Sequence, residues 1–159
     1  MSEMQRQFVA GPKWALATTV YFVVAIVVHV LTYPLFEIAL LSFQVCVVVG
    51  ALITAIGICI YFAALAGLRT GLRTGTLVTS GLYAIVRHPL YAASILFIIP
   101  GIVLAFRSWL LLPMPAIAYV AFRIFIPCEE GWLLDQYGQE YSLYRDRTNA
   151  IFPFPRHGR

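Results

Sequence analysis

Charged side chains are scarce in this chain of 159 residues, since Asp, Glu, Lys and Arg together make up only 11% of it. A soluble domain of this size carries roughly 25% charged residues. Hydrophobic residues reach 61%, and this apolar surplus must face lipid. The composition therefore excludes an ordinary soluble domain.

Cysteine is also rare, and its placement argues against disulfides and against a metal site. Cys46, Cys59 and Cys128 lie far apart, and the sequence contains no C-x-x-C pair and no His/Cys cluster. We therefore expect no bound metal. A recognisable signal peptide is missing as well, because no small-residue cleavage site follows a short apolar core. We expect the first apolar segment to remain in the protein as a helix.

Four long apolar segments fill most of the chain. A membrane-spanning helix needs about 20 apolar residues, and the candidates are residues 14–33, 39–68, 90–106 and 109–126. The second segment is longer than a bilayer requires, so it should tilt or project beyond the membrane. His29, in the first segment, is expected to be structural. The predicted fold is all-α: one integral membrane domain over residues 1–159 with about four transmembrane helices.

The basic residues are distributed unevenly around these segments. Nine of them lie before the first segment, between the second and third, or in the tail: Arg6, Lys13, Arg69, Arg73, Arg87, Arg145, Arg147, Arg156 and Arg159. Of the loops on the other side, only the one after the third segment carries a basic residue, Arg107. The positive-inside rule then places both termini in the cytoplasm. Anionic headgroups account for the net positive charge, so we expect no nucleic-acid partner.

The C-terminal region has the pattern of an amphipathic helix on the cytoplasmic face. Pro127 is expected to end or kink the fourth apolar helix. Beyond it, aromatic and apolar residues recur at spacings of three and four: Trp132, Leu133, Tyr137, Tyr141 and Tyr144. The predicted helix covers Glu129–Arg147 and ends before Pro153 and Pro155. The short repeat LRTGLRTG, residues 68–75, is expected to form an irregular loop.

The sequence RHPLY, residues 87–91, places a cation, an imidazole and a proline at the start of the third apolar segment. Pro89 suits the first turn of a helix, where its missing N–H would be unpaired in any case. Arg87 and His88 would then lie just ahead of a helix N-terminus, which favours an anion. An interfacial arginine and a capping histidine are the structural explanation, so the motif alone does not identify a binding site.

Glu129 and Glu130 directly follow the fourth apolar segment, on the same predicted face as this motif. The helix dipole alone would explain acidic residues near a helix start. With Arg87, His88 and the nearby tyrosines, they would also suit a zwitterion that carries a flat ring. Arg123 lies inside the fourth segment and either reaches the surface or points into the bundle toward the acidic pair.

Taken in order, these pieces resemble the isoprenylcysteine carboxyl methyltransferase family and the related phospholipid N-methyltransferases. The matching stretches are GLYAIVRHPLY (81–91), EEGWL (129–133), YGQEYSLY (137–144) and FP (152–153). The resemblance covers roughly residues 75–155, and the first two apolar segments carry no motif. Each stretch is weak by itself, whereas the combination is specific.

This resemblance implies an integral membrane enzyme, prokaryotic in type, located in the cytoplasmic membrane. It would transfer a methyl group from S-adenosylmethionine, leaving S-adenosylhomocysteine, to a lipophilic carboxylate, thiol or amine at the cytoplasmic interface. The residues implied to lie along the cofactor are Tyr83, Arg87, His88, Pro89, Tyr91, Glu129, Glu130, Leu133, Tyr141 and Tyr144. Glu129 or Glu130 is expected to act as general base or to orient the acceptor, and Arg123 to pair with an acceptor carboxylate.

Two positions depart from the family pattern. Pro127 stands where many relatives have a basic residue, and Ala150 where many bacterial relatives have arginine. Two alternatives stay open: a membrane reductase that uses NADPH, against which no additional basic cluster for a 2′-phosphate is visible, and a non-catalytic helical bundle. Gly50, Gly57 and Gly67 permit close helix packing within one chain or between two, so an oligomer is also open.

Overall fold

The computed structural model describes residues 10–39 and 42–154, and the named elements in that part of the chain are all helical. They are α2 (Ala10–Leu31), α3 (Phe43–Thr74), α4 (Leu82–Ile85), α5 (Pro89–Ala93), the π-helix η1 (Ser94–Ile98), α6 (Ile99–Phe106), the 3₁₀ helix η2 (Trp109–Leu111) and α7 (Met114–Arg147). Four helical segments are long and apolar enough to cross a membrane: Gly11–Leu31, Phe43–Thr74, Pro89–Phe106 and Trp109–Arg147. The predicted all-α membrane fold is confirmed. The residues Arg6, Pro155, Arg156 and Arg159 lie outside the described part.

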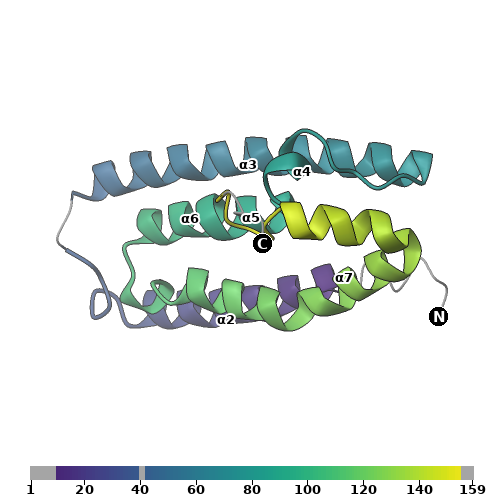
Figure 1. The fold of residues 1–159 in the computed structure, drawn as a ribbon. Coiled ribbons are helices and arrows are strands. Elements are labelled where there is room, and N and C mark those ends of the chain that lie inside the picture. The colour runs from purple at the N-terminus through teal and green to yellow at the C-terminus, as the bar shows by residue number, and fades with distance from the viewer. Residues whose placement is uncertain (1–9, 40–41, 155–159) are drawn as a thin grey trace.

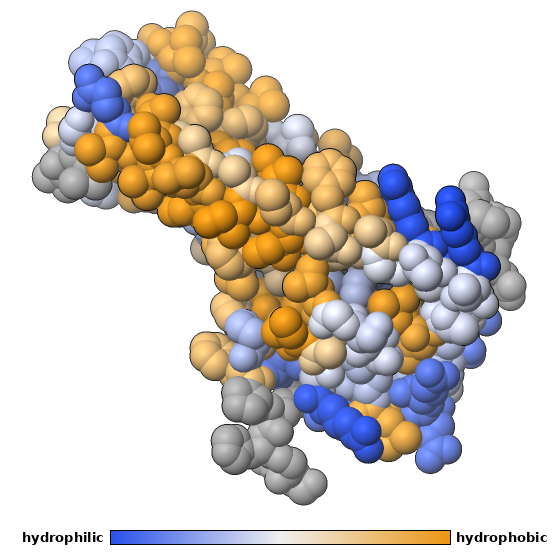
Figure 2. All heavy atoms as spheres, turned by 90° about the horizontal axis from the view of Figure 1, so that it is seen from above, coloured by the Kyte–Doolittle hydropathy of each residue, from blue (hydrophilic) through white to orange (hydrophobic). Residues whose placement is uncertain are grey.

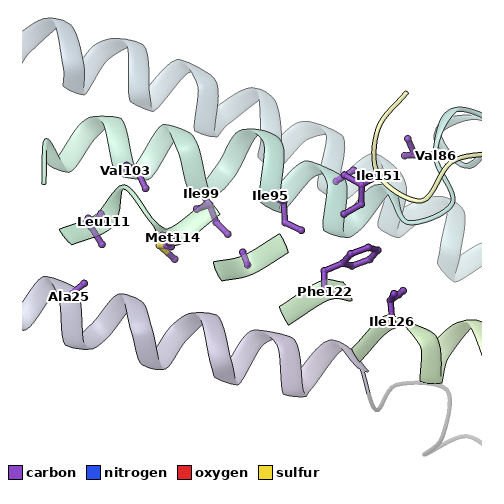
Figure 3. Packing of buried hydrophobic residues seen from close by; sticks show 12 residues of the cluster. Ala25, Val86, Ile95, Ile99, Val103, Leu111, Met114, Phe122, Ile126 and Ile151 are labelled. Carbon is purple, nitrogen blue, oxygen red and sulfur yellow. The ribbon is translucent and has the colours of Figure 1, made fainter. Parts of the chain in front are cut away.

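The helices form two layers (Figure 1). In one layer α3 packs along α5, η1 and α6, and in the other α2 packs along α7. Buried apolar side chains fill the space between the layers, among them Ala25, Ile95, Ile99, Met114 and Phe122 (Figure 3). Large apolar side chains such as those of Leu52, Phe62 and Ile124 are exposed on the outer surface. Apolar residues cover the long middle of the bundle, and hydrophilic residues gather toward one end (Figure 2).

Glycines allow α3 and α6 to approach closely. A Cβ atom added at Gly50 would lie 2.5 Å from the Gly101 carbonyl oxygen, and one at Gly101 would lie 2.6 Å from the Gly50 carbonyl oxygen. A Cβ atom at Gly57 would lie 2.8 Å from the Ile98 side chain. Small residues let two helix backbones meet in this way. The close packing at Gly50 and Gly57 is therefore within one chain.

The prediction of a loop over residues 68–75 is wrong for most of that stretch, because α3 continues through Thr74. Gly71 is buried, and a Cβ atom there would clash with Val78. The threonine hydroxyls also bond to carbonyls one turn earlier in the helix. Tertiary packing thus outweighs the low helix propensity of glycine. The helix ends at Gly75, whose left-handed backbone (φ 67°) forms the C-cap.

Pro127 was predicted to end or kink the fourth helix. It does not end the helix but lies inside α7. Membrane helices tolerate proline where neighbouring groups take up the freed backbone carbonyl. The break comes instead at Gly138 (φ 54°, ψ −124°), a conformation that is essentially restricted to glycine. The chain reverses direction there, so the rest of α7 runs back toward α5 (Figure 1). The predicted amphipathic helix is therefore two arms joined at Gly138.

The variant Gly138→Ala should lower the free energy of unfolding by about 1–3 kcal/mol, because alanine is strained in this conformation. Gly131→Ala is the matched control, since its Cβ atom would meet nothing within 4 Å in the same helix. It should be neutral or stabilising by up to about 1 kcal/mol. Thermal unfolding of both purified variants in detergent checks the difference, and equal melting temperatures would contradict it.

Candidate functional site

A cavity of about 420 Å³ lies at the end of the bundle where α4, α5 and the second arm of α7 meet. Apolar and aromatic side chains from α2, α3 and α7 form much of its wall, including Trp14, Ala15, Tyr61, Leu65, Leu68, Trp132 and Leu133. Arg87, His88 and Glu129 contribute charged groups to the same wall. The cavity therefore joins a largely apolar surface to a small polar cluster, as ligand sites commonly do.

The backbone of the segment after α7 holds the RHP motif in place. The Arg87 N–H donates to the Asn149 carbonyl (2.8 Å), and the His88 N–H donates to the Ala150 carbonyl (3.0 Å). His88 is the residue before α5, whose first residue is Pro89. Sequence reasoning missed this contact, because backbone pairing between distant segments leaves no residue pattern. Ala150 contributes its carbonyl oxygen, which any residue would supply.

The Arg87 guanidinium is buried, and each of its three nitrogen atoms donates at least one hydrogen bond. Its Nε and Nη2 atoms donate to Oε1 of Glu130 at 3.2 and 2.7 Å. Its Nη1 atom donates to the Arg145 carbonyl at 3.0 Å and also to the Thr148 carbonyl. Charge-assisted bonds of this kind are the strong ones. Arg87 therefore ties the end of α7 to the loop that carries the motif.

His88 lies between the two carboxylates of α7. Its Nε2 atom is 3.1 Å from Oε1 of Glu130, and its Nδ1 atom is 3.7 Å from Oε1 of Glu129. The other oxygen of Glu129 accepts a hydrogen bond from the Tyr91 hydroxyl at 3.1 Å. Glu129 lines the cavity, whereas Glu130 is turned to Arg87 and His88 and does not line it. The adjacent glutamates thus have different surroundings.

The surroundings of His88 change its acidity. Burial by itself would lower the pKa of the imidazole, but its interactions with the Glu129 and Glu130 carboxylates outweigh burial and raise the pKa above its ordinary 6.5. The imidazole therefore keeps its proton to a higher pH than an ordinary histidine. A protonated ring donates from both nitrogen atoms, which matches the carboxylate on either side.

Two tyrosines of the second α7 arm complete the site. The Tyr144 hydroxyl donates to the Tyr83 carbonyl at 2.6 Å and so fixes this arm to α4. Tyr141 is 1% exposed and lines the cavity, and its hydroxyl has no hydrogen-bond partner. A buried polar group without a partner is costly. The Tyr141 hydroxyl is therefore available to a polar group of a ligand.

The structure brings the predicted cofactor residues together around this cavity. Tyr83, Arg87, His88, Pro89, Tyr91, Glu129, Leu133, Tyr141 and Tyr144 line it. Arg123 is not brought there: it is exposed on α7 and donates to the Tyr119 hydroxyl at 3.3 Å. Glu130 lies about 10 Å further along that helix, by a rise of about 1.5 Å per residue. The wall supplied by α2 and α3 was missed, because those helices carry no polar motif.

Stability should fall as pH rises through the raised pKa of His88. The charged His88 ring makes its full contribution to the free energy of unfolding below its ordinary pKa of 6.5. This contribution is lost once the imidazole releases its proton in the folded protein. Thermal unfolding measured from about pH 6 to about pH 10 should show this loss, and His88→Gln should reduce it. His29→Gln is the control for removing a histidine elsewhere. An unchanged pH dependence in His88→Gln would contradict the assignment.

Comparison with known proteins adds one match. Residues 38–140, more than half of the chain, match the family model described as phospholipid methyltransferase. The matched region contains the RHP motif, both glutamates and Gly138, and it ends just before Tyr141 and Tyr144. No curated protein and no solved structure matches the chain.

Proposed function

Because this chain belongs to the phospholipid methyltransferase family, we propose that it transfers a methyl group from S-adenosylmethionine to a lipophilic acceptor. One observation carries the proposal. A single cavity combines an apolar wall from α2 and α3 with the charged groups of Arg87, His88 and Glu129. A charged donor and a lipid-soluble acceptor need both kinds of surface within reach of each other.

The residues around the cavity fit S-adenosylmethionine in chemistry and size. The cavity volume of about 420 Å³ lies within the range of about 300–1,000 Å³ that small-molecule sites occupy. The Glu129 carboxylate suits the ammonium or sulfonium charge, and the unpartnered Tyr141 hydroxyl suits a carboxylate or ribose oxygen. The Tyr137 ring lines the cavity and would stack on the adenine, whereas the Tyr91 ring already packs against Trp14, His88 and Phe122. Glu129, Tyr137 and Tyr141 are the residues that would hold the cofactor.

When bound, the cofactor supplies a methyl group on a sulfonium, which an electron-rich acceptor takes directly. The chain contributes placement and exclusion of water, which account for much of the acceleration in such a transfer. An amine acceptor must also lose a proton, and the Glu129 carboxylate, which lines the cavity, would accept it. Glu130, which does not line the cavity, acts as a positioning residue that holds His88 and Arg87. Arg87 lines the cavity and also ties the motif to the end of α7.

The charge distribution supports a cytoplasmic position for this cavity. Lys13, Arg69, Arg73 and Arg147 belong to the helix ends near it, whereas Arg107 lies at the other end of the bundle. The positive-inside rule places the basic end in the cytoplasm, where S-adenosylmethionine is made. The acceptor would reach the same cavity from the hydrocarbon region along the apolar wall.

Titration of the purified full chain with two ligands tests the proposal. Titration calorimetry in detergent should show saturable binding of S-adenosylhomocysteine and none of NADPH. NADPH binding without S-adenosylhomocysteine binding would support a reductase and overturn the proposal. Binding of neither compound by folded protein would also overturn it, in favour of a non-catalytic bundle.

The variant Glu129→Gln should separate the roles of the two glutamates. Loss of a general base typically costs 10²–10⁴-fold in rate, so transfer to an amine acceptor should fall by about 100-fold or more. With S-adenosylmethionine at saturation, transfer to a carboxylate acceptor, which needs no base, should fall much less. Asp135→Asn, which changes an exposed carboxylate on the same helix, is the control. Equal losses with both acceptor classes would contradict the assignment of Glu129 as base.

A further inference from the structure

A second hollow lies at the opposite end of the bundle, where α2 and α6 end and α3 begins. This groove of about 650 Å³ is lined by the polar or charged residues His29, Tyr33, Glu37 and Arg107. Its apolar lining residues are Val30, Phe43, Val47, Ala105 and Phe106. It shares no lining residue with the methyl-transfer cavity, which lies at the far end of the helices (Figure 1).

The charged pair in the groove is held rigidly. Nη1 of Arg107 is 3.1 Å from Oε1 of Glu37, and its Nε atom donates to the Ile38 carbonyl at 2.9 Å. The Ile38 N–H donates back to the Arg107 carbonyl at 2.7 Å, and the Trp109 N–H donates to the Phe36 carbonyl at 3.0 Å. These hydrogen bonds join residues 36–38 to residues 107–109. A cation and an anion are presented side by side in a fixed arrangement.

His29 adds a polar group that the protein itself leaves unpartnered. The residue is 8% exposed and lines the groove, and its Nδ1 atom is buried without a hydrogen-bond partner. Its ring meets the Tyr33 ring edge-on, with centroids 6.0 Å apart. Most buried polar atoms in proteins have a partner, so an exception needs a reason. The structural role predicted for His29 does not supply one.

We propose that this groove binds a zwitterionic phospholipid from the leaflet opposite the methyl-transfer cavity. The phosphate would meet His29 and Arg107, and the ammonium group would meet the Glu37 carboxylate. The apolar lining residues of the groove would contact the first carbons of the acyl chains. An anionic headgroup fits less well, because it would leave Glu37 facing a negative charge. Tyr33, exposed at this end, is typical of the membrane interface.

Histidine NMR gives a direct test, because the chain has three histidines. The full chain, labelled with ¹⁵N-histidine, is purified in a maltoside detergent, and His29→Gln assigns the His29 signals. Short-chain phosphatidylcholine, phosphatidylglycerol and inorganic phosphate are titrated separately. Phosphatidylcholine serves as the zwitterion because it has no free amine to act as a methyl acceptor.

Phosphatidylcholine should shift the His29 signals saturably. Phosphatidylglycerol should bind at least about tenfold more weakly, which corresponds to about 1.4 kcal/mol. Inorganic phosphate should leave the His29 signals unchanged. An equal response to inorganic phosphate would show a simple anion site and overturn the proposal. A shift confined to His88 would place the lipid in the other cavity and overturn it as well, as would the absence of any saturable shift.

The variant Glu37→Gln tests the charge argument independently. Removing the carboxylate should narrow or reverse the preference for phosphatidylcholine over phosphatidylglycerol, measured by native mass spectrometry of the intact chain. Because the change also breaks the pair with Arg107, His29→Leu gives a second measurement, which should weaken phosphatidylcholine binding at least about tenfold. Unchanged affinity and selectivity in both variants would overturn the proposal.

Discussion

Replacing Arg87 with alanine should lower the free energy of unfolding by about 3 kcal/mol and abolish cofactor binding. Arg87 is 8% exposed, and its guanidinium serves the Glu130 carboxylate and the carbonyls of Arg145 and Thr148. Without it, the negative charge of Glu130 would be paired only with His88. Removing one partner of a buried ion pair typically costs 3–5 kcal/mol. The lower end applies here because Glu130 is partly exposed, at 19%.

Two further variants make this prediction specific. Arg69→Ala removes an exposed arginine at the same end of the bundle and should change stability by less than about 0.5 kcal/mol. Arg87→Lys keeps the charge but loses the forked donor geometry, so it should recover only part of the stability. Unfolding in mixed micelles and titration with S-adenosylhomocysteine measure both effects. Full retention of stability and binding in Arg87→Ala would contradict the role given to this residue.

The variant Gly50→Ala should destabilise the bundle by about 1–3 kcal/mol through overpacking. Its Cβ atom would lie 2.5 Å from the Gly101 carbonyl oxygen and 2.9 Å from the Ala105 nitrogen. Both contacts are with backbone atoms, which cannot move aside as a flexible side chain can. The α3 and α6 helices would have to separate, and every contact along their shared face would loosen.

Gly67→Ala is the matched control for this change, because it makes the same substitution in the same helix. A Cβ atom there would lie 3.6 Å from the Tyr83 ring, which is an ordinary contact. The higher helix propensity of alanine should then leave stability unchanged or raise it by up to about 1 kcal/mol. Unfolding in mixed micelles compares the two variants. A melting temperature of Gly50→Ala at or above that of the parent would contradict the close approach of α3 and α6.

Several features of this protein could be predicted without coordinates. The scarcity of charge and the four apolar runs predict a membrane bundle, since a bilayer imposes a length and a composition on each span. The RHP motif, the glutamate pair and the tyrosines after them could be assigned to one site because their order resembles a family. None of these conclusions requires knowledge of how the helices pack.

Local expectations failed where packing outweighs propensity. Gly71 and its neighbours were predicted to form a loop, but Gly71 is instead buried in α3 against the segment that follows. Pro127 was predicted to end or kink the helix, but α7 continues through it and the reversal occurs at Gly138, whose φ of 54° no periodicity reveals. Propensities describe an isolated segment, whereas these residues respond to neighbours that are distant in sequence.

By itself, then, the sequence determined the membrane class, the helical content and the residue types of the site, because these depend on composition and short-range pattern. Only the tertiary structure decided how adjacent residues divide their roles. Glu129 lines the cavity while Glu130 is held by Arg87 and His88, and Arg123 is exposed and bonded to Tyr119 instead of lining the cavity. Helix directions and the reversal at Gly138 set these orientations, and one-dimensional spacing does not encode them.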